Sequence, residues 1–203
     1  MSAGPAPVSP RTPINLEKVS ALLVDDNAQA LDILSQVVSG FGVRTITRCE
    51  SGEDAQAALR RATFDLIIAD VHMPGMDGYE LIAWLRREGP QPNRFAPVLL
   101  VTGHTRQNEV VKARDCGANF IVAKPLTPKV MLERIVWVAR EDRMFIEAPH
   151  YVGPDRRFRR LGPPAGIDGR RSDDLPVELG DAQAPNLSDD EITAMLKPTK
   201  VAL

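Results

Sequence analysis

Five short apolar runs alternate with five amphipathic stretches, and this alternation is the feature that most constrains the fold. The apolar runs have the length of buried strands, and the amphipathic stretches repeat apolar residues at helical spacing. Strands that alternate with helices need right-handed crossovers, which build a parallel sheet with helices on both faces. We therefore predict a doubly wound, five-stranded α/β fold of the (βα)5 type. The expected strands cover residues 19–24, 43–47, a run ending at 70, 97–101 and 119–123, and the expected helices cover 28–39, 52–61, 78–87, 106–116 and 128–143.

The last of these helices also carries a prediction about its buried face. Residues 128–143 place Leu132, Ile135, Val136 and Ala139 along one side of a helix. We expect that side to pack on the sheet.

Composition excludes several classes of protein. The chain has 203 residues, 43% of them hydrophobic, and a formal net charge of −2, so the whole molecule has no bias toward nucleic acid or an anionic membrane. Its two cysteines, Cys49 and Cys116, are too few for a disulfide framework and favour a reducing compartment. The chain has no apolar run long enough to span a bilayer and no secretory signal at its start, so we expect a cytoplasmic protein.

Shifts in composition divide the chain into three expected parts. Residues 1–17 are rich in Pro, Ser and Ala and are expected to be a disordered leader. Residues 18–143 carry the alternating pattern and form the domain. Residues 144–203 are rich in Arg, Pro and Gly and are expected to be a mostly disordered tail with a short amphipathic helix near 188–197.

Five polar residues follow apolar runs at the points where strands are expected to end. The carboxyl ends of parallel strands meet at one edge of the sheet, where open α/β folds bind ligands. Each residue alone has an ordinary explanation, since Asp26, for example, can cap a helix. Together they predict one polar site made of Asp25, Asp26, Asp70, Thr102 and Lys124.

These residue types suit phosphoryl chemistry. Three clustered carboxylates raise one another's pKa unless a cation lies among them, and a set of oxygen ligands favours Mg²⁺. A carboxylate can act as the nucleophile toward a phosphoryl group. A lysine ammonium and a threonine hydroxyl can offset charge on the transferred group. We therefore expect Asp70 to accept the phosphoryl group, assisted by Thr102 and Lys124.

Four short motifs, in this order and spacing, resemble the response-regulator receiver domain of two-component signalling, also called the CheY-like fold. They are Val24-Asp25-Asp26, Asp70 with Met73-Pro74-Gly75-Met76-Asp77-Gly78, Val101-Thr102-Gly103, and Lys124-Pro125. The resemblance covers about residues 18–143. It implies a flavodoxin-like (βα)5 sheet and phosphorylation of Asp70 by a histidine kinase or phosphotransfer protein.

The resemblance also implies roles for the surrounding residues. It implies that Lys124 contacts the phosphoryl group, that Thr102 moves toward it as a switch, and that the Lys124-Pro125 peptide bond is cis. It further implies Mg²⁺ held by Asp25, Asp26, Asp70 and the backbone carbonyl of His72. The domain would then be a regulatory phosphoacceptor and not an enzyme, apart from assisting its own phosphorylation and dephosphorylation.

Two features depart from the family pattern. The family has Tyr or Phe three residues before the lysine, where this chain has Ile121, and the neighbouring Phe120 faces the other way. His72 and His104 each lie two residues beyond a site residue. They are either exposed loop residues or residues that tune the lifetime of the acyl phosphate.

The tail contains arginines interleaved with aromatic residues. Arginine can stack on purines, bind guanine edges and clamp phosphates. The segment resembles the arginine-rich extensions of CheY-like cyclic di-GMP effectors, and Arg156 and Arg160 match the RxxxR spacing of PilZ domains without the rest of that fold. The alternatives are a solvated basic linker and a segment folded back on the domain. The candidate ligand residues are Tyr151, Arg156, Arg157, Phe158, Arg159, Arg160, Arg170 and Arg171.

Near the end of the chain, Ser188 and Glu191 form a capping box before an apolar stripe that includes Ile192. So short a helix is marginal in water, so we expect it to dock. It resembles the peptide by which the flagellar switch protein binds CheY, which suggests the output face (fourth helix, fifth strand, fifth helix) of this chain or of a second copy. The alternative is a helix with no role.

Three functions compete. The favoured one is a single-domain response regulator whose output is contact with an unknown downstream protein. The second is a cyclic di-GMP effector that acts through the arginine-rich tail, for example on the flagellar motor. The third, an aspartyl phosphatase of the haloacid dehalogenase kind, needs an Asp-x-Asp, which the adjacent Asp25-Asp26 pair does not supply. The tail lacks the periodic helices of a helix-turn-helix module, so we expect no DNA binding.

Overall fold

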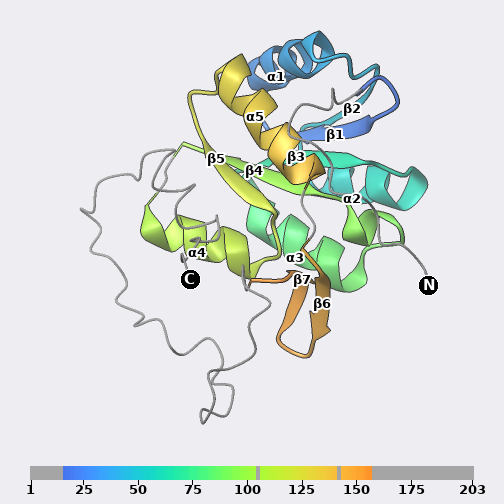
Figure 1. Cartoon of the computed structure of the whole chain (residues 1–203), viewed down its shortest axis with the longest axis vertical. Coiled ribbons are helices and arrows are strands. Elements are labelled where there is room, and N and C mark those ends of the chain that lie inside the picture. Colours follow the sequence, from blue (N-terminus) through green and yellow to red (C-terminus); the bar gives the residue numbers. More distant parts are fainter. Residues whose placement is uncertain (1–15, 104–105, 141–142, 157–203) are drawn as a thin grey trace, which may run out of the picture.

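The computed structural model describes residues 16–103, 106–140 and 143–156 (Figure 1). The leader up to residue 15 and the tail from residue 157, with its expected helix at 188–197, lie outside the described residues. Among the described residues, no helix is both long and apolar enough to cross a bilayer.

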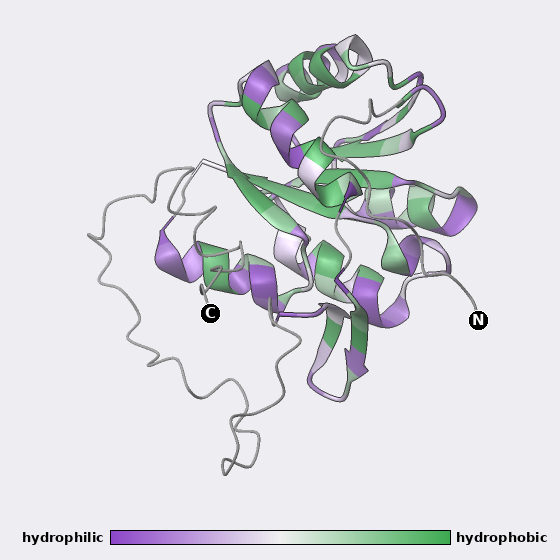
Figure 2. Ribbon diagram, viewed as in Figure 1, coloured by the Kyte–Doolittle hydropathy of each residue, from purple (hydrophilic) through white to green (hydrophobic). Residues whose placement is uncertain are grey.

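A five-stranded parallel sheet with the order β2-β1-β3-β4-β5 forms the centre of the domain. This confirms the predicted doubly wound α/β fold. Burial on both faces explains why the central strands consist almost entirely of apolar residues, as the hydropathy colours show (Figure 2). The strands are β1 (Ser20–Val24), β2 (Thr45–Cys49), β3 (Leu66–Asp70), β4 (Val98–Thr102) and β5 (Phe120–Ala123).

Helices cover both faces of this sheet. Figure 1 shows α1 and α5 together on one face, and α2, α3 and α4 on the other. Four of the helices begin at a residue whose side chain accepts a backbone hydrogen bond, and Asp77 forms a full capping box with Glu80. The helices are α1 (Ala28–Gly40), α2 (Gly52–Arg61), α3 (Gly78–Glu88), α4 (Gln107–Asp115) and α5 (Pro128–Ala139), and a short 3₁₀ helix, η1 (Asn93–Phe95), precedes β4.

Two details of the predicted elements are wrong. Strand β2 lies two residues later than expected, because Ser20 of β1 pairs with Thr45 in the sheet register. Helix α5 ends at Ala139, and its buried face differs from the predicted one: Leu132 is 39% exposed, and Ala139 is exposed. The side chains that α5 buries are Met131, Arg134, Ile135 and Val138. Arg134 is accommodated because its guanidinium lies over the Phe120 ring, 4.8 Å from the centroid.

A β-hairpin follows α5, where a mostly disordered tail was expected. Strands β6 (Phe145–Ala148) and β7 (Tyr151–Pro154) pair antiparallel across a two-residue turn. The expectation of disorder is therefore wrong for residues 145–154. Two short β-prone runs, Phe145-Ile146 and Tyr151-Val152, are the sequence signal, which the Pro- and Arg-rich context hid.

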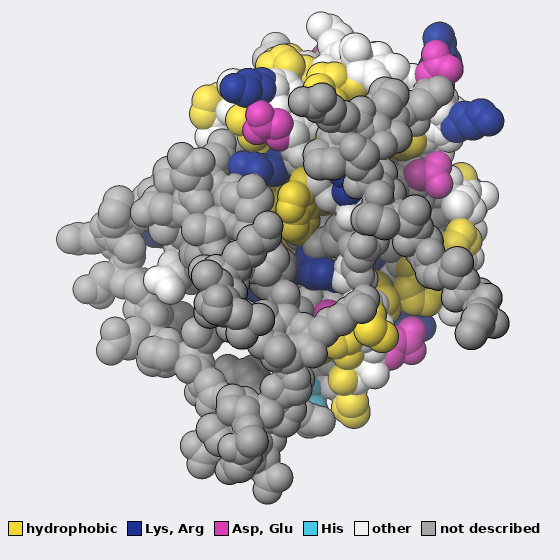
Figure 3. Space-filling view, in the orientation of Figure 1, with side chains coloured by type: hydrophobic (Ala, Val, Ile, Leu, Met, Phe, Trp, Pro, Cys, Tyr) yellow, Lys and Arg dark blue, Asp and Glu magenta, His cyan; other side chains and the backbone are white. Residues whose placement is uncertain are grey.

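The hairpin lies below α3, η1 and the turn between α4 and β5, at the edge of the sheet where the strands begin (Figure 1). Apolar side chains gather over it in the space-filling view (Figure 3). Phe95 of η1 packs edge-on against Phe145, with 4.7 Å between ring centroids.

Arg86 of α3 is a fully buried cation, with only 1% of its surface exposed. Its guanidinium donates hydrogen bonds to the carbonyl oxygens of Gly117 and Arg94 and to Asn119 Oδ1 at 2.9, 2.6 and 3.2 Å, and it lies 5.5 Å from the centroid of the Phe145 ring. All three acceptors are neutral, and burial lowers the pKa of Arg86 to about 10. Arg86 thus joins α3, η1, the α4–β5 turn and the hairpin.

Replacing this arginine is predicted to destabilise the domain. Arg86→Ala removes three hydrogen bonds and leaves the carbonyl oxygens of Gly117 and Arg94 without this donor, while Asn119 Oδ1 keeps the Val98 N–H. Relief of arginine desolvation offsets only part of that loss. We expect the free energy of unfolding to fall by about 2–4 kcal/mol in urea denaturation. Arg87→Ala, which alters the exposed neighbour on the same helix, should change it by less than about 0.5 kcal/mol. Equal losses in the two variants would contradict the role assigned to Arg86.

Candidate functional site

The structure brings all five predicted polar residues to the carboxyl edge of the sheet. Asp25 follows β1, Asp70 ends β3, Thr102 ends β4 and Lys124 follows β5. Carboxylate oxygens of Asp25, Asp26 and Asp70 lie within 4.8 Å of one another. Asp25, Asp70 and Thr102 are buried, whereas Asp26 is exposed, so the cluster opens to solvent on one side.

Lys124 contacts two of these carboxylates. Its Nζ lies 3.0 Å from Asp25 Oδ2 and 3.1 Å from Asp70 Oδ1. The Lys124 backbone N–H donates to the Thr102 carbonyl oxygen at 2.7 Å, which ties the ends of β4 and β5 together. The Lys124–Pro125 peptide bond is cis, as the resemblance implied.

The pKa values reflect this crowding. Burial raises the pKa of Asp70 above its ordinary value; Lys124 opposes that rise, and the charge of Asp25 adds to it. Burial lowers the pKa of Lys124, but its hydrogen bonds to Asp25 and Asp70 outweigh that effect and leave the pKa raised. Lys124 therefore remains an ammonium, whereas the negative charge on buried Asp70 costs free energy.

The cluster fits a divalent cation. Its three carboxylates supply oxygen ligands only, which is the donor set that Mg²⁺ prefers, and the exposed side at Asp26 leaves room for water ligands. The ammonium of Lys124 balances only part of the negative charge on the three carboxylates. Asp25, Asp26 and Asp70 are the side chains that would hold the ion.

Glycines hold the loop after Asp70 in place. Gly78, the first residue of α3, lies so close to the backbone that a Cβ there would clash with the Asp70 carbonyl oxygen. Gly75 has a φ of +75°, and Met76 packs against Gly52 at the start of α2. The Pro-Gly-Met-Asp-Gly motif is thus explained by close backbone packing beside Asp70.

The structure describes one of the two histidines and the position where the family has an aromatic residue. His72 is exposed two residues after Asp70, and His104 lies outside the described residues, so their tuning role stays a prediction. Ile121 is buried in β5, while Phe120 packs edge-on against Trp137 with 5.2 Å between ring centroids.

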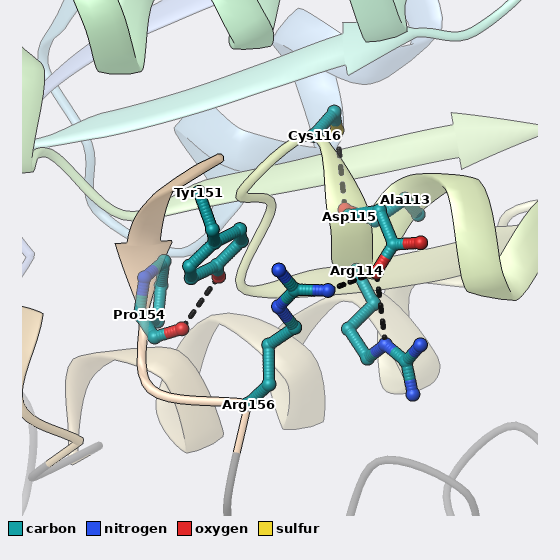
Figure 4. A network of polar contacts seen from close by, with 7 residues as sticks. All are labelled: Ala113, Arg114, Asp115, Cys116, Tyr151, Pro154 and Arg156. Carbon is teal, nitrogen blue, oxygen red and sulfur yellow. Dashed lines mark hydrogen bonds and ion pairs between the residues drawn. The ribbon is translucent and has the colours of Figure 1, made fainter. Parts of the chain in front are cut away.

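Tyr151 and Arg156, two of the predicted ligand residues, are engaged within the domain (Figure 4). Tyr151 is 7% exposed, its hydroxyl donates to the Pro154 carbonyl oxygen, and burial raises its pKa to about 12. The Arg156 guanidinium lies over the Tyr151 ring, 3.9 Å from the centroid, and its Nη1 is 2.7 Å from Asp115 Oδ1. Tyr151 is therefore buried, and little of its surface is open to the ligand for which it was a candidate.

The other residues of that predicted set lie outside the described residues: Arg157, Phe158, Arg159, Arg160, Arg170 and Arg171. Sequence reasoning also missed the link between Tyr79 of α3 and Glu109 of α4. The Tyr79 hydroxyl donates to Glu109 Oε2 at 2.8 Å. Nothing in the sequence spacing signals this contact, because it depends on how the two helices pack.

Removing the charge of Asp70 is predicted to stabilise the metal-free domain. Because its pKa is raised, folded Asp70 binds more protons than the unfolded chain above about pH 4, so stability falls as pH rises from there toward the raised pKa. Asp70→Asn should raise the melting temperature at pH 7 by about 2–4 °C per kcal/mol of penalty relieved. The gain should vanish at about pH 3.5.

Asp65→Asn is the matched control for that measurement, since Asp65 lies just before the opposite end of the same strand and is exposed. It should leave the melting temperature nearly unchanged. A lower melting temperature for Asp70→Asn at pH 7 would show that the ion pair with Lys124 outweighs desolvation.

Comparisons with known proteins agree with this geometry. A model of the response regulator receiver domain matches residues 21–136. The chemotaxis protein CheY of Pseudomonas aeruginosa is 30% identical over 114 residues, covering 56% of this chain and 90% of that protein. CheY-3 of Vibrio cholerae is 25% identical over 119 residues, covering 59% and 90%.

Solved structures give the same result. CheY4 of Vibrio cholerae matches with a TM-score of 0.55 at 29% identity, covering 59% of this chain and 98% of that one. A putative response regulator from Chloroflexus aurantiacus matches with a TM-score of 0.56 at 28% identity, covering 61% and 98%. The hairpin lies beyond the residues that the family model matches. The chain belongs to the response regulator receiver domain family, and its domain is a CheY-like receiver.

Proposed function

We propose that this receiver is a phosphorelay switch that accepts a phosphoryl group on Asp70. The observation that carries the proposal is the contact between Lys124 Nζ and Asp70 Oδ1 at 3.1 Å, within a cluster of three carboxylates. Asp70 is the buried carboxylate at the end of the central strand β3. Its carboxylate can attack a phosphorus atom that arrives from the solvent side.

The residues around Asp70 have complementary roles in that transfer. An Asp70 oxygen forms a bond to phosphorus as the bond to the donor's leaving group breaks, and the leaving group keeps the electron pair. The Lys124 ammonium offsets charge on the phosphoryl oxygens, and the Thr102 hydroxyl donates a hydrogen bond to one of them. Mg²⁺, bound by Asp25, Asp26, Asp70 and the backbone carbonyl of His72, would supply further charge neutralisation.

The family points to a histidine kinase or phosphotransfer protein as the donor, and to a downstream protein as the target. With such partners the chain would work in the cytoplasm, as a regulatory acceptor that does not turn over a separate substrate. The expected helix at 188–197 is a candidate occupant of the face formed by α4, β5 and α5. Cyclic di-GMP is not favoured, because Tyr151 and Arg156, the two described members of the set proposed to bind it, already contact each other.

Labelling with acetyl phosphate tests the acceptor. With Mg²⁺, intact mass should show one added phosphoryl group on the wild-type chain, and chelation with EDTA should prevent it. Asp70→Asn should abolish the label because the nucleophile is gone. Asp65→Asn, at the other end of the strand, should be labelled like the wild type. A label that persists in Asp70→Asn would overturn the assignment of the acceptor.

The lifetime of the label tests the two histidines. If His72 and His104 steer or block the attacking water, the His72→Ala/His104→Ala double variant should lose the phosphoryl group at a rate several-fold different from the wild type. The decay is followed by intact mass after removal of the donor, with His150→Ala at the hairpin turn as the control. An unchanged decay rate in the double variant would assign both histidines to exposed loops without a role.

A further inference from the structure

Helix α4 is the helix least firmly held in the domain. It has nine residues, of which Val110 and Ala113 are buried, and its N-cap Arg106 makes no side-chain cap hydrogen bond. The other four α-helices each have such a cap and at least three buried residues. A helix with few buried contacts and no cap shifts at a lower cost in free energy than its neighbours.

This helix is also close in sequence to the acidic site. Thr102 ends β4 within the site, and α4 begins at Gln107. Thr102 is fully buried, and its carbonyl oxygen is bound by the Lys124 N–H. Only four residues separate Thr102 from the first residue of α4 in the sequence.

A hydrogen bond and an ion pair hold α4, one near each end. In the first turn, Glu109 accepts a hydrogen bond from the Tyr79 hydroxyl at 2.8 Å. At the last residue, Asp115 pairs with Arg156 Nη1 at 2.7 Å (Figure 4). The second contact links α4 to Arg156, two residues beyond the end of the hairpin and the last described residue.

The hairpin itself is held mainly by other elements. Arg94 Nη2 lies 3.3 Å from Glu147 Oε1, and Phe145 packs on Phe95. The backbones of Gly153 and Gly117 touch, since a Cβ on Gly153 would come within 2.8 Å of Gly117 Cα. Because the contacts with Arg94 and Phe95 anchor the hairpin on η1, a shift of α4 relative to η1 would strain the pair between Asp115 and Arg156.

We propose that the segment from Tyr151 to Arg156 is a docking motif that latches the hairpin and the start of the tail to the end of α4. Phosphorylation of Asp70, at the carboxyl edge of the sheet, shifts α4 and releases this latch. The acidic site thus controls the attachment of the hairpin at the opposite edge. Tyr151 holds the Arg156 guanidinium in position, and Asp115 supplies the charge that binds it. The inference rests on the proposed phosphorylation of Asp70.

Amide hydrogen exchange of the full chain, with and without acetyl phosphate and Mg²⁺, tests the latch. Intact mass first establishes that the wild type carries the phosphoryl group. Peptides covering residues 107–116 and 143–156 of the labelled protein should then exchange about two- to fivefold faster, as expected for loss of one partly exposed ion pair. Asp70→Asn treated in the same way should show no change.

Two variants separate the latch from general loosening. Arg156→Gln should exchange faster in the hairpin before labelling, and labelling should add nothing further there, although residues 107–116 still respond. Glu147→Gln removes the ion pair to Arg94, which does not involve α4, and should keep the full hairpin response to labelling.

Each remaining outcome counts against a stated claim. Absence of the label in the wild type overturns the proposed function and the inference with it. A labelled wild type with unchanged exchange in residues 143–156 overturns the inference alone. An equal response of the hairpin in Arg156→Gln and the wild type shows that the coupling does not run through Arg156.

Discussion

Negative charge crowded at one edge of the sheet is the constraint on which the rest of this domain depends. Three carboxylates lie within 4.8 Å of one another, two of them buried, and the Lys124 ammonium reaches both buried ones. Burial is the main reason that the pKa of Asp70 is raised, and the nearby charge of Asp25 adds to it. This crowding favours a positive charge at the site, and it depends on the ends of four strands being folded together.

The parallel sheet makes this crowding possible. Strands β3 and β4 are buried along their full length, so their positions are set by packing on both faces and not by the polar residues at their ends. The glycines after Asp70 then bring the start of α3 against its backbone. A rigid apolar core thus holds an electrostatically unfavourable cluster, as is typical of sites prepared for a cation and a phosphate.

The opposite edge of the domain contains a buried positive charge. Arg86 is a buried cation whose acceptors are neutral, and the aromatic ring of Phe145 covers it from the hairpin. The hairpin is thus packed as part of the domain, although it lies beyond the residues matched by the receiver family. The pair between Asp115 and Arg156 joins it to α4, the α-helix with the fewest buried residues and the one without a side-chain cap.

The sequence alone determined the class of fold and the membership of the acidic site. Strand and helix periodicities are local properties, and the polar residues Asp25, Asp70, Thr102 and Lys124 each follow an apolar run, so their convergence follows from parallel topology. The bounds of β2 and the buried face of α5 were predicted less well, because register and packing decide them. Local patterns do not contain that information.

Only the tertiary structure decided what the residues after α5 do. Their composition is typical of a linker, and Tyr151 and Arg156 have the chemistry of a nucleotide site. Their real partners, Pro154 and Asp115, include a residue 41 positions away from Arg156. A contact between such distant residues arises from the packing of whole elements, so no spacing rule in the sequence could have predicted it.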